Sequence, residues 1–325
     1  MLNTRTASFS HWLFLVVVVV ITYPTIASAT ETMAVSSSSH AWWFWPTILF
    51  FFCLLLGILA VMAGVGGGVL YVPLVSGFFP FHIDIVRGIG LMVALAGALA
   101  AGPGLLRRNL ANLRLALPVA LIASACSIVG ALLGLYLSRL NPNIIQACLG
   151  GTIVGIAFLL LFSKNTEKPV VTKQDAIGMA FGLQGIYWDD GSRENVSWKT
   201  HRTFLGLCLF ILIGLLAGMF GLGAGWANVP VLNLIMGVPL KVSVATSKFL
   251  LSITDTSAAW IYLNRGCVIP LIAVPSIVGL MLGSILGVRI LAKAKPKFIR
   301  YMVIAVLLFA GLKALDKGLG LGILG

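Results

Sequence analysis

Apolar runs long enough to cross a bilayer follow one another along the chain, and short polar segments separate them. A membrane-spanning helix needs about 20 consecutive apolar residues, whereas a membrane β-barrel requires regular alternation of apolar and polar residues. Runs such as FLVVVVVI and FLLLF do not alternate. We therefore expect an all-α polytopic membrane protein, with uninterrupted helices at residues 84–103, 115–138, 143–162, 241–263, 268–290 and 298–315.

Two further apolar runs are interrupted by glycine. Residues 64–73 read GVGGGVLYVP, and residues 221–230 read GLGAGWANVP. The first of these runs extends from about Pro46 to Phe81, which is too long for one simple crossing and suits two short arms around a break. We assign Pro73 and Pro230 to these breaks, near the first turns of the second arms, where proline is tolerated. Each segment is predicted to be re-entrant, turning back as a hairpin.

The two interrupted runs belong to a tandem repeat. Shifting Gly64 onto Gly221, by 157 residues, also aligns Arg108 with Arg265 and Pro118 with Pro275. With a small further shift, GALLG at 130–134 aligns with GSILG at 283–287. Self-similarity of this kind indicates two copies of one structural unit. The repeats are predicted at residues 46–162 and 203–315, each a glycine-broken hairpin followed by three helices, with a polar connector at 163–202 and a tail at 316–325.

The N-terminal end has the pattern of a secretion signal. Residues 1–29 contain Arg5, an apolar stretch at 12–21 and an Ala-x-Ala sequence at 27–29. A cleaved signal and an uncleaved anchor are both compatible with this pattern. Either one places residues 30–45 on the extracytoplasmic side.

The net charge of +13 arises from basic residues in short loops rather than from a basic face, so we expect no nucleic-acid partner. If each interrupted segment turns back, the basic loop 104–114, the connector and the basic cluster 289–297 all lie on the cytoplasmic side, as the positive-inside rule favours. Each repeat then crosses an odd number of times. We expect two inverted repeats in a multi-pass protein of the cytoplasmic membrane, with a substrate site where the repeats meet.

The sequence contains no catalytic or metal-binding constellation. The five cysteines are scattered without a CxxC pair, and neither an HExxH motif nor a Ser-His-Asp order occurs. We expect no enzymatic activity, no metal and no cofactor. A homo-oligomer is compatible with the sequence, which leaves the oligomeric state open.

The glycine breaks suit an anion. Backbone groups freed inside a membrane must be buried in protein or must line a water-filled cavity, and a helix start presents unpaired N–H groups with a partial positive charge. An alternative reading is a small-residue packing motif, since both copies have GxxxG spacing. The backbone groups expected to bind substrate belong to Gly64, Gly66, Gly67, Gly68, Gly221, Gly223 and Gly225.

Side chains of the second repeat add polar chemistry. Residues 241–255 read KVSVATSKFLLSITD, in which Lys248 and Asp255 are spaced to lie on nearly the same helix face. We expect Lys248 to supply charge and Asp255 to couple transport to protons, although a structural pair or a snorkelling lysine is an alternative. Ala98 occupies the position equivalent to Asp255 in the first repeat. Further substrate contacts are expected from Asn228, Ser243, Thr246 and Ser247.

The paired motifs GxGGGxxxxP and GxGAGxxxxP, the second followed by MGVPLKVSVATSKF, NRGCVIP and GSILG, resemble the TauE/SafE sulfite exporter family over most of residues 55–315. The resemblance implies a carrier that moves sulfite or an organosulfonate, generally outward, across the cytoplasmic membrane. One departure is Arg87-Gly88-Ile89-Gly90, which stands where the second repeat has an Ala-Thr-Ser sequence.

We therefore expect a proton-coupled secondary transporter that exports a small sulfur-containing anion. An uncoupled anion channel is one alternative. A membrane scaffold that recruits a partner through the 163–202 connector is another.

Overall fold

The computed structural model describes residues 43–63, 66–107, 111–162, 169, 171, 174–189, 194–291 and 296–320. The predicted signal or anchor, nearly all of the segment 30–45, and Gly64 lie outside the described residues.

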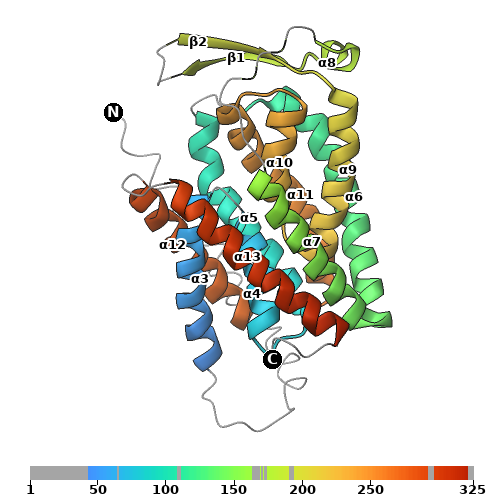
Figure 1. Cartoon of the computed structure of the whole chain (residues 1–325), viewed down its shortest axis with the longest axis vertical. Coiled ribbons are helices and arrows are strands. Elements are labelled where there is room, and N and C mark those ends of the chain that lie inside the picture. The colour runs from blue at the N-terminus through green and yellow to red at the C-terminus, as the bar shows by residue number, and fades with distance from the viewer. Residues whose placement is uncertain are drawn as a thin grey trace.

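The described chain is a bundle of helices, which confirms the all-α polytopic fold (Figure 1). Five helices among the described residues are long and apolar enough to cross a membrane by length and composition, namely α5, α6, α7, α9 and α12. The first half contains α3 (Phe44–Ala63), α4 (Gly67–Phe78), α5 (Ile83–Arg107), α6 (Leu113–Leu140) and α7 (Pro142–Phe162). The second half contains α9 (Thr203–Phe220), α10 (Gly225–Pro230), the π-helical turn η2 (Val231–Ile235), α11 (Leu240–Asn264), α12 (Pro270–Leu291) and α13 (Pro296–Leu319).

Both interrupted segments turn back on themselves. The ring of Trp45, at the start of α3, lies 5.9 Å from the ring of Phe79, just after the end of α4. In the second half, the backbone N–H of His201, just before α9, donates to the carbonyl of Met236, just after η2, at 3.0 Å. The first hairpin enters the bundle from the lower end in Figure 1, and the second enters from the upper end.

The arms of these hairpins are unequal, which corrects the expectation of two short arms. Helices α3 and α9 have 20 and 18 residues, whereas α4 has 12 and α10 has 6 before η2 continues it. Pro73 and Pro230 lie inside the second arms and not at the interruptions. A proline removes one backbone hydrogen bond, and helix α10 changes to π-helical geometry immediately after Pro230.

The two halves pack against each other in matching pairs. Helix α12 packs along α3 as α6 packs along α9, and α11 contacts α6 as α12 contacts α5. Two further pairs join equivalent helices, α5 with α11 and α7 with α13, and α4 packs on α5 within the first half. The most extensive helix pairs therefore join the two halves.

The repeated GALLG and GSILG sequences lie where these helices touch. A Cβ atom added to Gly130 of α6 would lie 3.0 Å from the Cα of Leu215 in α9, and one added to Gly283 of α12 would lie 3.0 Å from the Cα of Leu54 in α3. Small residues let membrane helices approach this closely and gain dispersion contacts along their length. Close packing is thus the role of these glycines.

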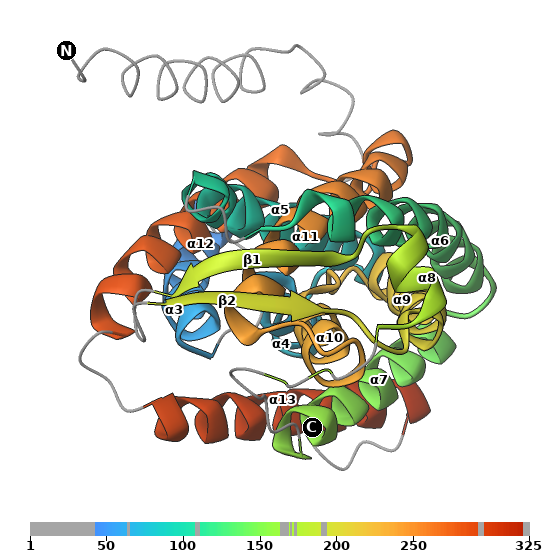
Figure 2. The same cartoon turned by 90° about the horizontal axis from the view of Figure 1, so that it is seen from above.

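The connector forms a small substructure on the upper end of the bundle. It contains α8 (Ala176–Ala180) and an antiparallel hairpin of β1 (Gln184–Asp189) and β2 (Glu194–Lys199), which lies across the helices when viewed from above (Figure 2). Tyr187 and Trp198 are buried, while Ile186 and Trp188 are exposed. The alternation of side chains along β1 explains why its two faces differ.

Candidate anion-binding site

The two helix interruptions meet inside the bundle. A Cβ atom added to Gly225 would lie 3.4 Å from both the Cα and the N of Gly66. Gly66 is the N-cap residue of α4, and Gly225 is the first residue of α10. The starts of the two short helices therefore touch, although they are far apart in the sequence.

Local backbone geometry explains why the chain stops and restarts at these positions. Helix α9 ends at Gly221 with φ of 71°, and Gly223 has φ of 70°, a left-handed conformation that glycine adopts at no steric cost. Gly66 is extended, with φ of −65° and ψ of 145°. Neither helix start has a side-chain cap. The first N–H groups of an α-helix have no partner within the helix, so both starts offer donors to the space between them.

Helices α5 and α11 border this junction. Ala94 of α5 lies against both breaks, because a Cβ atom added to Gly68 would be 3.1 Å from the Ala94 Cβ, and one added to Gly223 would be 2.9 Å from it. From α11, a Cβ atom added to Gly225 would lie 3.2 Å from Cδ1 of Leu251, and one added to Gly223 would lie 2.9 Å from Oδ2 of Asp255. The junction is thus enclosed by one central helix from each half.

Unpartnered polar groups are concentrated around the second break. Asp255 and Asn228 are each 1% exposed. Among the described residues, neither the Asp255 carboxylate nor the Asn228 amide has a hydrogen-bond partner, and the indole N–H of Trp226 also has none. The Asp255 carboxylate lies beside the backbone of Ala224 without reaching hydrogen-bond geometry. Burying such groups without partners costs free energy, and this arrangement is typical of a polar binding site.

The other predicted side chains are placed differently. Lys248 is close enough to Asp255 for an electrostatic interaction, but the two form no direct ion pair among the described residues. Ser247 is buried. The Ser243 hydroxyl donates to the Val238 carbonyl at 3.1 Å, and the Thr246 hydroxyl accepts from the backbone N–H of Asn112 at 3.2 Å.

The hydroxyls of Ser243 and Thr246 are therefore engaged in contacts within the protein. On α11, Ser243 lies about 18 Å and Thr246 about 14 Å from Asp255 along the helix axis. The structure does not bring these two residues to the junction. The predicted residues that it does bring together are Gly66, Gly67, Gly68, Gly221, Gly223, Gly225, Asn228 and Asp255.

Comparison of the sequence with known protein families identifies the family of this chain. Residues 48–314 match the family model of the sulfite exporter TauE/SafE. The chain belongs to the TauE/SafE family. The match spans almost all of the region from α3 to α13, so the protein is a multi-pass membrane transporter of the TauE/SafE type.

Curated relatives of this TauE/SafE protein carry the same class of name. The "Probable membrane transporter protein YunE" of Bacillus subtilis (strain 168) is 25% identical over 274 residues, which cover 82% of this chain and 96% of the relative. The "Probable membrane transporter protein ORF9" of Sinorhizobium sp is 28% identical over 261 residues, covering 79% of this chain and 87% of the relative. No solved structure matches the chain.

A second buried polar cluster of this TauE/SafE protein lies beside the junction. Arg87 of α5 is fully buried; its Nε donates to the hydroxyl of Tyr262 at 3.2 Å, and its Nη2 lies 3.2 Å from Oδ1 of Asp84. The Tyr262 hydroxyl donates to the carbonyl of Gly218 at 3.0 Å. The cluster therefore ties α5 to α11 and to the end of α9.

The sequence pattern singled out Arg87 but neither Asp84 nor Tyr262 as its partner. A cation within an apolar run needs a partner, and Asp84, three residues earlier, is the partner that this signal could have suggested. The tyrosine partner lies in the other repeat, so only the folded arrangement shows it.

Proposed function

We propose that this transporter exports a small sulfur-containing anion, sulfite or an organosulfonate, across the cytoplasmic membrane, and that the anion binds between the starts of α4 and α10. The observation that carries the proposal is the contact between Gly66 and Gly225. Two helix starts at one point combine their partial positive charges and their free N–H groups. An anion between them gains both contributions.

Side chains complete the proposed site. The buried amide of Asn228 adds an N–H donor within one turn of the start of α10. Lys248 contributes positive charge from α11, through a side chain long enough to extend toward Asp255. We assign Ser247 as an additional hydroxyl donor. Ser243 and Thr246 have a structural role at the connector end of α11, through their hydrogen bonds to Val238 and Asn112.

The two halves act as inverted repeats in this mechanism. Their hairpins enter from opposite ends of the bundle (Figure 1), and their other helices pack in matching pairs. A relative rocking of the halves then exposes the junction to one side of the membrane and afterwards to the other, as in other transporters built from inverted repeats.

Proton coupling is assigned to Asp255. A buried carboxylate with no directly paired cation is expensive in its charged form inside a membrane, so it is suited to carrying a proton during one half of the cycle. Ala98 occupies the equivalent position in the first repeat. The coupling site is therefore single, although the backbone site is duplicated.

The test is flux in proteoliposomes containing the purified full-length chain. Labelled sulfite is expected to undergo saturable counterflow, and a pH gradient is expected to drive its uphill movement. Asp255→Asn, with Asp316→Asn on α13 as the matched control, should retain counterflow and lose the response to pH. A lack of saturable flux with sulfite and with simple organosulfonates would refute the substrate class. Flux that no pH gradient drives uphill would indicate an uncoupled channel.

A scaffold role for the connector is the second candidate, and the exposed pair Ile186 and Trp188 on β1 favours it. Exposed apolar residues on a strand are suited to contact with a partner. Replacing both residues with serine should leave sulfite flux unchanged if the chain is a carrier. Loss of a cellular phenotype with intact flux would support the scaffold.

A further inference from the structure

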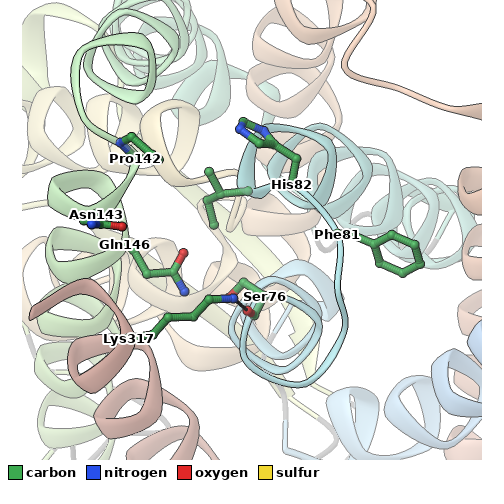
Figure 3. Close-up of a pocket in the computed structure, with 8 residues that line it drawn as sticks. Ser76, Phe81, His82, Pro142, Asn143, Gln146 and Lys317 are labelled. Carbon is green, nitrogen blue, oxygen red and sulfur yellow. Dashed lines mark hydrogen bonds between the residues drawn. The ribbon is translucent and has the colours of Figure 1, made fainter. Parts of the chain in front are cut away.

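A small pocket lies at the end of the bundle opposite the connector. Its volume is about 200 Å³, and four helices surround it (Figure 3). Ser76 comes from α4, His82 precedes α5, Gln146 belongs to α7 and Lys317 belongs to α13. Phe81, Ile83, Pro142 and Asn143 complete the lining.

This pocket is separate from the junction of the two helix starts. Ser76 lies nine residues after Gly67 on α4, which corresponds to about 14 Å along the helix axis. The side chain of His82 is 58% exposed. The pocket therefore lies at the rim of the protein, where an ion can reach it without passing the junction.

Two donors extend into the pocket from the neighbouring helices α7 and α13 (Figure 3). Gln146 is only 6% exposed, and its amide nitrogen has no hydrogen-bond partner among the described residues. The Lys317 ammonium donates to the backbone carbonyl of Ser76 at 3.0 Å, which holds it at the pocket wall and leaves further N–H groups, since an ammonium has three. In Figure 3 the Gln146 amide and the Lys317 ammonium extend toward the same space. Two donors directed at one space are suited to an acceptor between them.

The surrounding charges favour a negatively charged acceptor. None of the residues that line the pocket is acidic. The nearby carboxylate of Asp84 faces Arg87 at 3.2 Å and His82 at 3.7 Å. Helices α5 and α7 both begin at the pocket, and helix starts carry partial positive charge. Ser76 and Lys317 lie in the last turns of α4 and α13, where helix ends carry partial negative charge. The Lys317 ammonium adds a full positive charge there and donates to the Ser76 carbonyl.

We propose that this pocket is a second anion site, which binds one small oxyanion between the Gln146 amide and the Lys317 ammonium. An oxyanion has several acceptor oxygens and can accept from both donors at once. The volume is below the range of pockets for drug-sized ligands, so the site takes an ion of sulfite or sulfate size. The site does not depend on which anion the junction transports.

The experiment is equilibrium dialysis of purified full-length protein with labelled sulfite and, separately, with labelled sulfate. The variants are Gln146→Glu, which adds a negative charge to the pocket, and Lys317→Gln, which removes the positive one. The control is Lys313→Gln, four residues earlier on α13, because Lys313 contacts the ring of Phe78 and does not line the pocket. Both pocket variants should weaken the binding of one oxyanion per chain by about tenfold or more, and the control should not.

Each result has a definite meaning. Loss of sulfite binding alone would identify a station on the transport route, and loss of both anions would identify a general oxyanion site; both support the proposal. If Gln146→Glu fails to fold, Lys317→Gln decides, with Lys317→Arg expected to retain binding. Wild-type protein that binds neither anion, or folded pocket variants that bind both as well as wild type, would overturn it. Asn228→Leu, at the junction, should retain pocket binding, which separates failure here from failure of the transport proposal.

Discussion

Gly68→Ala is expected to destabilise the junction, whereas Gly66→Ala, two residues earlier, is not. A Cβ atom on Gly68 would lie 2.7 Å from the carbonyl oxygen of Leu222 and 2.9 Å from that of Gly90. Both atoms belong to the backbone, so no side-chain rotation relieves the contact. A Cβ atom on Gly66 would lie 3.8 Å from the Cα of Gly225, which is ordinary van der Waals contact.

The magnitude follows from two opposing effects. Overpacking of a close-packed site costs about 1–3 kcal/mol, and an alanine in a helix gains at most about 1 kcal/mol over glycine. Gly68 lies in the first turn of α4, where that gain is smaller. We expect Gly68→Ala to lose about 1–2 kcal/mol of stability. Gly66 has φ and ψ that alanine adopts freely, so its change should stay within about 0.5 kcal/mol.

The assay is unfolding of the purified variants in detergent, followed by tryptophan fluorescence, together with sulfite flux in proteoliposomes. Gly68→Ala should unfold at lower temperature and transport less. Gly66→Ala should unfold like wild type, and any loss of flux would then report on the binding space itself. Equal stability of Gly68→Ala and wild type would refute the close contact between α4 and the turn that joins α9 to α10.

The remaining predictions concern the buried cluster and the proposed cation. Arg87→Gln should lower the free energy of unfolding by about 3 kcal/mol or more, because it leaves Asp84 without its buried partner. Tyr262→Phe should lower it by only about 1–3 kcal/mol, through the lost hydrogen bonds. Thermal unfolding of both variants measures the difference, and equal losses would contradict the ion-pair assignment. Lys248→Gln should raise the KM for sulfite about tenfold, or about 1.4 kcal/mol. Ser243→Ala should leave this KM unchanged and reduce only stability. If flux assays show a raised KM for Ser243→Ala and an unchanged KM for Lys248→Gln, the substrate binds near the connector instead.

Local signals were enough to predict the helices and their interruptions. The bounds of the uninterrupted helices follow the apolar runs, because the membrane selects segments by length and hydrophobicity. The glycine motifs located both breaks, since glycine adopts the left-handed geometry found at Gly221 and Gly223. The positions of Pro73 and Pro230 relative to the interruptions could not be predicted from the sequence. A membrane helix continues through proline when neighbouring groups compensate for the lost hydrogen bond.

Long-range contacts explain why the connector hairpin and the surroundings of Ser243 and Thr246 could not be predicted from the sequence. The connector hairpin is short and depends on burial of Tyr187 and Trp198, which the polar sequence around the turn did not indicate. Ser243 and Thr246 carry the right chemistry for an anion, yet their hydroxyls are engaged by Val238 and Asn112. A hydroxyl in the sequence does not reveal which acceptor or donor it will meet.

The amino-acid order alone was sufficient to predict a helical membrane protein with two glycine breaks, because hydrophobic length and backbone freedom are properties of neighbouring residues. Tertiary packing decided that the two breaks touch, that Arg87 finds Tyr262, and that Gln146 and Lys317 face one pocket. Those pairs come from helices far apart in the chain, and they meet only because each half buries its apolar faces against the other.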